Sequence, residues 1–413
     1  MTKIAVIGAG ITGVTTAYAL SLRGYDVTVF DRHRYPAMAT SYANGGQLSA
    51  SNAEVWNSWG TVLKGLKWMF RPEAPFLLNP LPTWHKLSWF AEFIANIPKY
   101  GLNTVETTRL AIAARQHMLA WAETEKIDFD WQPKGILHVY RREADLAAAR
   151  RVNAHLTRGG LERVEVSPAD IRRIEPAIAI DCLGGFYTAS DSTGDIHKYT
   201  RGLADAAARR GVCFVQDAEV LSLAAQNEHA LVTWRPAGDE AARIGPVESS
   251  SFDGLVICAG VASRAFAAML GDRINIYPVK GYSITVPLED EQSRAAAPYV
   301  SLLDDAAKIV TSRLGPGRLR VAGTAEFNGE NYNIRNDRIL PLTNWVRTLF
   351  PSVATDRVIP WAGLRPMTPS MLPKVGPGRR PRVFYNTGHG HLGWTLSAGT
   401  AEAVAASIAG ARL

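Results

Sequence analysis

The chain has 413 residues, of which 47% are hydrophobic and 20% charged, as in a globular protein with two domains or one elaborated domain. Its net charge of +7 suits acidic ligands or an anionic membrane surface, and the lack of a dense Lys/Arg block gives no reason to expect a nucleic-acid partner. No run of about 18 apolar residues could span a bilayer, and the three cysteines are too scattered for a disulfide framework or a CxxC metal site. We therefore expect a cytoplasmic protein without a metal, with at most peripheral contact to the inner face of the cytoplasmic membrane.

The first 31 residues predict the unit around which the rest of the chain is arranged. KIAVIGAGITGVTTAYALSLRGYDVTVFD reads as a strand, a tight glycine turn, a helix and a second strand that ends on an acid. Gly8 lets the chain turn sharply, Gly10 leaves the backbone open to a pyrophosphate, and Gly13 lets helix and strand pack closely. Because the first strand begins almost at Met1, no signal peptide is expected.

The same unit predicts the class of ligand. The N–H groups at the start of the helix, near Ile11 and Thr12, would point at phosphate with the positive end of the helix dipole behind them. Asp31, followed by Arg32, stands where a carboxylate accepts hydrogen bonds from a ribose diol. An acid there favours a free 2′-hydroxyl, so FAD or NAD is expected rather than NADP.

The polar stretch that follows, RHRYPAMATSYANGGQLSA, predicts a loop that continues along the bound dinucleotide. Its composition alone would equally suit an ordinary surface loop. The residues expected to contact the cofactor are Ser41, Asn44, Gly45, Gly46, Gln47 and Leu48.

Residues 54–100 are rich in tryptophan, phenylalanine and lysine, broken by prolines. Such a segment could lie at a membrane interface or over a quinone entrance. It could instead cap the active site or pack between domains. The sequence leaves both readings open.

The middle of the chain alternates between helical and strand-like patterns. Helices are expected at 107–124, 144–159 and 197–210, and strands at 135–142, 212–215, 219–223 and 230–234, followed by a loop over 236–251. The strands would return to the sheet that begins at Lys3. The apolar run FDGLVICAGVAS then ends in a small-residue turn that contains Ala259 and Gly260.

The last third predicts a second sheet. YPVKGYSITVPL, KIVTSR and GRLRVAGTAEF alternate and suit an antiparallel sheet, with a helix at 340–349 beside it. A strand at 383–386, the turn TGHGHLGWT and an Ala-rich helix end the chain. The turn is a second glycine-rich entry into a helix, whose N–H groups could stabilise negative charge on reduced flavin.

Several separated motifs, taken together, resemble the FAD-dependent D-amino-acid oxidase and glycine oxidase superfamily. They are the N-terminal fingerprint, TSYANGGQLS, VICAG, YPVKGYS, WAGLRPMTPSMLPKVG and NTGHGHLGWT. The likeness is greatest to bacterial D-amino-acid dehydrogenases and runs from Lys3 to about Ala405. It implies FAD rather than NAD, and an α/β fold: a Rossmann-like FAD-binding domain (1–55, 150–272, 355–413) with a discontinuous α+β substrate domain (56–149, 273–354) whose sheet is mainly antiparallel.

The resemblance extends the expected cofactor site beyond the first loop. The added residues are Ala259, Gly260, Gly363, Gly388, His389, Gly390, Leu392, Gly393, Trp394 and Thr395.

Four residues are expected to act on the substrate. Arg365 in GLRP matches the family's carboxylate-binding arginine, and a guanidinium suits a carboxylate because its planar fork binds two oxygens and stays charged. Lys308 takes a position often held by tyrosine and could offer a second cation or point to solvent. Tyr282 could line the pocket, and His391, at a variable position, could tune substrate choice.

The implied reaction is the oxidation of a D-amino acid or a cyclic imino acid, with hydride transfer from the α-carbon to flavin N5 and electrons passing to a quinone or another acceptor. One alternative is an oxidase that uses oxygen and acts on glycine or sarcosine. Another is a non-catalytic flavin-binding subunit of an electron-transfer complex. The sequence does not name the substrate.

Overall fold

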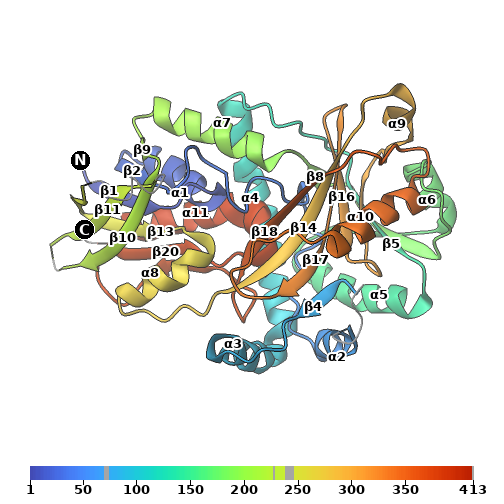
Figure 1. Cartoon of the computed structure of the whole chain (residues 1–413), viewed down its shortest axis with the longest axis horizontal. Helices are drawn as coiled ribbons and strands as arrows, with labels where there is room; N and C mark the ends of the chain where they lie inside the picture. Colours follow the sequence, from blue (N-terminus) through green and yellow to red (C-terminus); the bar gives the residue numbers. More distant parts are fainter. Residues whose placement is uncertain (69–73, 227, 238–245, 412–413) are drawn as a thin grey trace.

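The structure is a computed structural model that describes residues 1–68, 74–226, 228–237 and 246–411. Parts of the aromatic segment 54–100 and of the predicted loop 236–251 lie outside these residues. Two large sheets lie side by side along the long axis (Figure 1).

The first sheet has six strands, and its core confirms the Rossmann-like prediction. In spatial order its strands are β19 (Lys374–Pro377), β20 (Val383–Thr387), β13 (Gly254–Ile257), β1 (Lys3–Ile7), β2 (Asp26–Phe30) and β9 (Cys213–Val215). All pairs are parallel except that of β19 with β20. Apolar residues of this sheet form a buried cluster with those of the helices on one face. These helices are α1 (Ile11–Ser21), α4 (Tyr100–Thr124), α7 (Ile196–Arg209) and α11 (Gly393–Ala409).

The other face of this sheet is covered by α8 (Ser263–Met269) and by a separate three-stranded antiparallel sheet. Its strands are β10 (Ala218–Ala225), β11 (Ala230–Pro236) and β12 (Glu248–Phe252). The expectation that the strands at 219–223 and 230–234 join the sheet of Lys3 is therefore wrong, and so is that for the strand at 135–142, which belongs to the second large sheet. A parallel neighbour requires a crossover of a dozen or more residues, whereas short connections produce antiparallel pairs.

The second large sheet has nine strands and is mainly antiparallel, as predicted. Its path is β18 (Ile359–Met367), β14 (Tyr277–Pro287), β17 (Arg318–Phe327), β16 (Ile309–Leu314), β15 (Ser301–Asp304), β5 (Ile136–Tyr140), β7 (Gly184–Thr188) and β6 (Val164–Val166), with β4 (Phe76–Leu78) beside β17. Helix α10 (Asn336–Leu349) covers one face through a buried apolar cluster. The opposite face looks toward the first sheet.

At three places, an element belongs to a different part of the structure from the one that the predicted domain ranges give it. Strands β6, β7 and β18 belong to the nine-stranded sheet, although the sequence predicts 150–272 and 355–413 as parts of the FAD-binding domain. Helix α4 lies within 56–149, assigned to the substrate domain, yet it packs on α11. Hydrophobic periodicity predicts the type of an element, whereas its sheet depends on pairing between distant residues.

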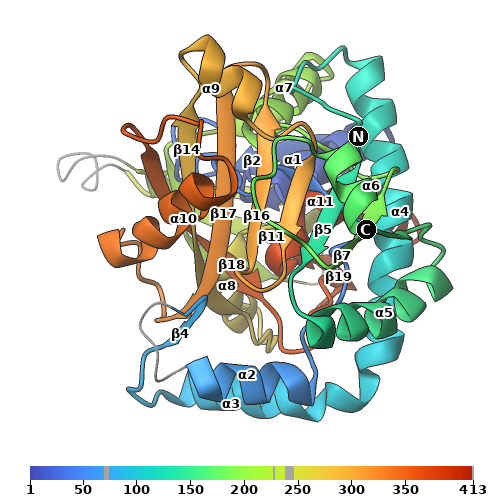
Figure 2. The ribbon, with the colours of Figure 1, turned by 90° about the vertical axis from the view of Figure 1, so that its right-hand side faces the viewer.

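On one side of the molecule, along the lower edge of the view, α2 (Trp59–Trp68) and α3 (Trp84–Ala95) lie side by side (Figure 2). Trp89 and Phe93 are buried against residues of β14 and β17, which supports the packing reading for them. Trp59 and Trp84, by contrast, are 60% and 83% exposed. Across the described ranges, every helix falls short of the length and apolar character needed to cross a bilayer.

Candidate active site

A cavity of about 1150 Å³ lies between the two large sheets. One wall is formed by the ends of β1, β2 and β13 and by the turns that follow them, and the other by the near face of the nine-stranded sheet. Most residues predicted to hold the cofactor line it. Of that set, Gly13, Gly46 and Leu48 do not.

The glycine turn after β1 has the geometry that its spacing predicts. Gly8 has a φ of +104°, in the region that favours glycine. A Cβ on Gly13 would lie 1.8 Å from the Gly8 carbonyl oxygen, so α1 packs directly on the turn. A Cβ on Gly10 would meet only Ser41 Oγ, at 3.5 Å, which leaves the approach to the backbone open.

The start of α1 is suited to phosphate. Its first turn holds no acidic residue, and Gly10 provides no side-chain cap. The N–H of Ile11 donates to Ser41 Oγ at 3.0 Å, which ties the following loop to the helix start. Asp31, at the end of β2, accepts hydrogen bonds from the N–H groups of Ala9 (2.6 Å) and His33 (2.9 Å). Its carboxylate is thereby held at the cavity wall, where a ribose would lie.

The loop after Asp31 runs against the second sheet. A Cβ on Gly45 would lie 2.6 Å from Val310 Cγ2, and one on Gly46 would lie 2.7 Å from Ser312 Cβ. Both glycines therefore serve close approach to β16. Leu48 is 2% exposed and belongs to the core of the first domain, so the expectation that it contacts the cofactor is not supported.

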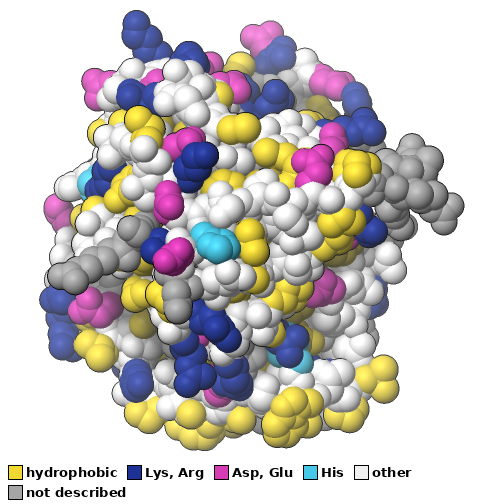
Figure 3. Space-filling model, turned by 90° about the vertical axis from the view of Figure 1, so that its left-hand side faces the viewer, with side chains coloured by type: hydrophobic (Ala, Val, Ile, Leu, Met, Phe, Trp, Pro, Cys, Tyr) yellow, Lys and Arg dark blue, Asp and Glu magenta, His cyan; other side chains and the backbone are white. Residues whose placement is uncertain are grey.

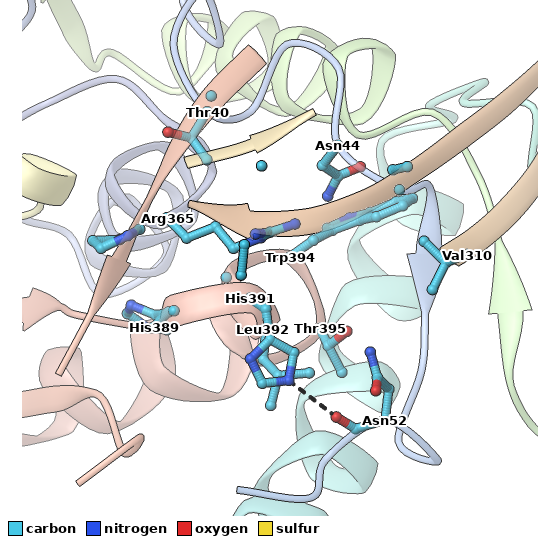
Figure 4. Close-up of a pocket in the computed structure, with 18 of the residues that line it drawn as sticks. Thr40, Asn44, Asn52, Val310, Arg365, His389, His391, Leu392, Trp394 and Thr395 are labelled. Atoms are coloured by element: carbon cyan, nitrogen blue, oxygen red, sulfur yellow. Dashed lines mark hydrogen bonds between the residues drawn. The ribbon is translucent and has the colours of Figure 1, made fainter. Parts of the chain in front are cut away.

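The late glycine turn joins β20 to α11 on the same cavity. Gly388 and Gly390 have φ values of +78° and +58°. Leu392, Trp394 and Thr395 follow and line the cavity (Figure 4). The two glycine turns, far apart in the sequence, thus face one elongated cavity, as a dinucleotide requires.

His389 lies in this turn, but its ring is buried in the protein interior. Its Nε2 lies 2.9 Å from Thr400 Oγ1, and burial lowers its pKa to about 3. An unfolded chain would bind a proton on this histidine at a higher pH, near 6.5. The contribution of neutral His389 to the stability of the folded protein is therefore fully present above about pH 6.5, and it is lost as the pH decreases toward 3.

We expect the free energy of unfolding to decrease by up to about 1.4 kcal/mol per pH unit in this range through His389 alone. The variant His389→Gln should weaken the pH dependence of the melting temperature between pH 6.5 and 4.5. The exposed His117 provides the control His117→Gln, which should leave the dependence unchanged. Equal slopes in wild type and His389→Gln would contradict this assignment.

Arg365 projects from β18 into the cavity (Figure 4). Its Nη1 donates to the carbonyl oxygen of Thr324 at 2.8 Å. Within the described part of the chain no carboxylate pairs with it, and burial alone lowers its pKa to about 10. The guanidinium is thus a charged donor at neutral pH, available to an anionic ligand.

His391 lies near Arg365 and packs on the ring of Trp56, with centroids 4.8 Å apart. Its Nε2 is 3.2 Å from the carbonyl oxygen of Asn52, which can only accept, so Nε2 carries the hydrogen. Its Nδ1 is buried and has no partner among the described residues. Burial lowers the pKa of His391 to about 4, so the ring is neutral at physiological pH.

The other two residues expected to act on the substrate, Lys308 and Tyr282, already have partners within the protein. Lys308 lines the cavity and pairs with Asp305, so it is not free to act as an isolated second cation. Tyr282 contributes to the cavity wall, but its hydroxyl donates to Glu326 Oε2 at 2.8 Å within the cluster under α10. Alternation along β14 places Gly281 and Ser283 on the cavity face instead. A catalytic role for the Tyr282 hydroxyl is therefore not supported.

Several cavity residues were not anticipated. Glu54 accepts a hydrogen bond from the Tyr100 hydroxyl at 2.6 Å, and Trp56 stacks on His391. Gly281 and Thr324 contact the guanidinium of Arg365. Gly281 had a signal in the KGYS motif, and Glu54 and Trp56 lie in the aromatic segment 54–100, for which a cap over the active site was one of the readings. Thr324 had no signal, because its contact with Arg365 joins distant segments.

The chain belongs to the family described as FAD dependent oxidoreductase, whose profile matches residues 3–407. FAD is therefore the cofactor that the two glycine turns and Asp31 would hold. The geometry of these residues suits a dinucleotide, and this conclusion does not depend on the match to the family.

Similar proteins include several named D-amino acid dehydrogenase. The chain is 59% identical over 409 residues to D-amino acid dehydrogenase 3 of Mesorhizobium japonicum, covering 99% of this chain and 97% of that protein. It is 40% identical over 422 residues to D-amino acid dehydrogenase of Paramagnetospirillum magneticum, covering 99% and 95%. The fold resembles that of glycine oxidase from Bacillus cereus (TM-score 0.73, 18% identity, 99% and 95% covered) and of L-proline dehydrogenase from P. horikoshii (0.74, 16%, 100% and 94%).

Proposed function

We propose that this chain is an FAD-dependent dehydrogenase that oxidises D-amino acids to imines, which water then hydrolyses. The single observation that carries this proposal is the buried, charged guanidinium of Arg365, which faces the cavity with no carboxylate partner in the described ranges. A substrate carboxylate would complete it with two parallel hydrogen bonds. The names of the relatives agree with this substrate class.

The chain's own residues bind and orient the substrate. FAD, when bound, supplies the acceptor for the hydride that leaves the α-carbon. Arg365 holds the carboxylate, and Gly281, which has no side chain, leaves the space that the guanidinium of Arg365 occupies. The lone pair on Nδ1 of neutral His391 is an acceptor for an amine hydrogen. With a pKa of about 4, His391 orients the amine and does not remove its proton at neutral pH.

The test is anaerobic mixing of the yellow protein with a panel of D-amino acids, their L-enantiomers and cyclic imino acids. We expect the flavin absorbance to bleach with one or more D-substrates and to persist with the L-enantiomers. A protein that holds FAD but bleaches with none of them would favour the non-catalytic alternative and contradict the proposal.

The electron acceptor is proposed to be a quinone or a similar carrier rather than oxygen. We expect dye reduction with a D-substrate to exceed peroxide formation by at least about tenfold, because relatives 59% and 40% identical to this chain are named dehydrogenases. Comparable peroxide formation would support the alternative of an oxidase, and glycine and sarcosine should then be tested as substrates.

A peripheral membrane contact through α2 and α3 is the second part of this proposal. Figure 3 shows hydrophobic side chains along the lower edge of the molecule, below a group of Lys and Arg side chains. The exposed large apolar residues between 59 and 102 are Trp59, Leu63, Leu81, Trp84, Leu87, Ile94 and Leu102. Exposed Lys64, Lys67 and Lys99 lie on the same segment and suit anionic lipid. The cavity lining also includes Lys64 and Trp68, so its edge adjoins this surface.

Vesicle co-sedimentation tests this surface. The holoenzyme should bind vesicles that contain anionic phosphatidylglycerol, and Trp59→Ser with Trp84→Ser should reduce binding by about tenfold without changing dye-coupled activity in solution. Replacement of the exposed Trp131, remote in sequence from this surface, provides the control. Unchanged binding of the double variant would exclude α2 and α3 as the contact.

A further inference from the structure

The sheet face beside Arg365 contains an irregularity. Strands β14 and β17 pair Tyr282 with Gly323 and Lys280 with Glu326. Between these two pairs, Thr324 and Ala325 face the single residue Gly281. This two-against-one arrangement is a β-bulge, a feature that re-aims groups next to functional sites.

Thr324 has an unusual backbone conformation at this bulge. Its φ is +66°, in the left-handed region, which a β-branched residue rarely adopts. The segment around β4 holds Thr324 in this conformation. The N–H of the next residue, Ala325, donates to the carbonyl oxygen of Pro75 at 2.8 Å, and Ala325 pairs with Phe76 of β4. The strained residue presents its carbonyl oxygen to Nη1 of Arg365 at 2.8 Å.

Gly281 supports the same guanidinium from beneath. A Cβ on Gly281 would lie 2.3 Å from Nη2, 2.5 Å from Cζ and 2.7 Å from Nη1 of Arg365. The whole guanidinium therefore lies against the backbone of Gly281, at a distance that any other residue would prevent. Gly281 and Arg365 lie on adjacent strands, since β14 pairs with β18.

These contacts leave one edge of the guanidinium for a ligand. One Nη1 hydrogen is used by Thr324, and one face is covered by Gly281. Nε and Nη2 remain, and they form a fork that matches two carboxylate oxygens. Because the group is already oriented, little side-chain freedom is lost when a carboxylate binds.

We propose that Gly281 and the carbonyl group of Thr324 form a seat for Arg365 and are positioning residues for the carboxylate of the substrate. This inference rests on the proposed function only in taking that ligand to be an amino acid. By orienting the guanidinium, the seat would favour the binding of any carboxylate to Arg365.

The variant Gly281→Ala tests the seat. It displaces the guanidinium, so the KM of a D-substrate and the Kd of benzoate, measured by the perturbation of flavin absorbance, should rise by about 10- to 100-fold. The flavin content and the kcat should change little. The control is Gly317→Ala in the turn between β16 and β17, where an added Cβ meets no atom within 4 Å.

A double-mutant cycle separates the seat from a general effect on packing. In an Arg365→Met background, Gly281→Ala should have no further effect on the Kd of benzoate, because the group that it displaces is absent. An equal loss in both backgrounds, or an unchanged Kd in Gly281→Ala alone, would overturn the proposal.

Thr324 provides a second variant pair in case Gly281→Ala folds poorly. Thr324→Gly keeps the carbonyl group and adopts a positive φ without strain, so it should raise the melting temperature and leave the Kd of benzoate within about twofold. Thr324→Pro cannot adopt that φ and should raise the Kd. A wild-type protein that binds benzoate but oxidises no D-amino acid would contradict the proposed function and leave the seat standing.

Discussion

Replacing Arg365 with methionine is expected to raise the KM for a D-amino acid by roughly 100-fold or more, while the purified protein keeps its FAD. Removing one partner of a buried, hydrogen-bonded ion pair costs about 2 to 5 kcal/mol, and each 1.4 kcal/mol corresponds to a factor of ten. Arg365 is buried and, among the described side chains, faces no carboxylate that could take over its role. Its side chain does not hold either glycine turn, so cofactor binding should persist.

The measurement is steady-state dye reduction together with the ratio of flavin to protein. Arg365→Lys keeps the charge but loses the fork and should show an intermediate KM. Arg357→Met is the matched control, because this exposed arginine pairs with Glu289 at 2.8 Å on the surface. A normal KM in Arg365→Met would exclude Arg365 as the carboxylate site.

Replacing Gly13 with alanine is expected to abolish FAD binding and to lower the free energy of unfolding by about 3 kcal/mol. The new Cβ would lie 1.8 Å from the carbonyl oxygen of Gly8, and a backbone atom in a tight turn cannot move aside as a flexible side chain can. The start of α1 would have to separate from β1, which moves the N–H groups away from the phosphates.

Two matched variants separate folding from cofactor binding. Gly10→Ala places its Cβ 3.5 Å from Ser41 Oγ, so the apoprotein should be as stable as wild type, yet the methyl group would stand where the pyrophosphate approaches. Gly65→Ala in α2 meets no atom closer than 3.9 Å and should leave both properties unchanged. Flavin content and thermal unfolding with and without added FAD are the readouts. A Gly13→Ala protein with normal flavin content would contradict the packing argument.

Local chemistry explains why much of the cofactor site could be predicted. The spacing of Gly8, Gly10 and Gly13 before a helix has a steric reason at each position. In the structure Gly8 has a positive φ and Gly13 packs directly on the turn, whereas the approach of a pyrophosphate to Gly10 stays a prediction. Asp31 follows from the same unit, because it ends the adjacent strand. The expected contact of Leu48 with the cofactor is not supported, because Gln47–Leu48 forms a short strand whose successive side chains point to opposite sides, and Leu48 packs into the core.

The substrate side was predicted less completely. Arg365 was identified through the family resemblance, and the structure brings it to the cavity. Tyr282 lies next to Gly281, but the alternation of a strand directs its hydroxyl to the opposite face. Which of two adjacent strand residues faces a cavity depends on what the sheet packs against.

By itself, the sequence determined the types of most elements and the dinucleotide turn, since each depends on residues close together in the chain. Arg365 was predicted from the sequence as well, but through the resemblance to a family that several separated motifs carry. Only the tertiary structure decided that β6, β7 and β18 join the nine-stranded sheet, and that Thr324 and Gly281 hold the guanidinium of Arg365. These features arise from strand pairing, a bulge and close packing between distant segments. No local pattern of residues encodes them, because their energies depend on which surfaces meet after the chain has folded.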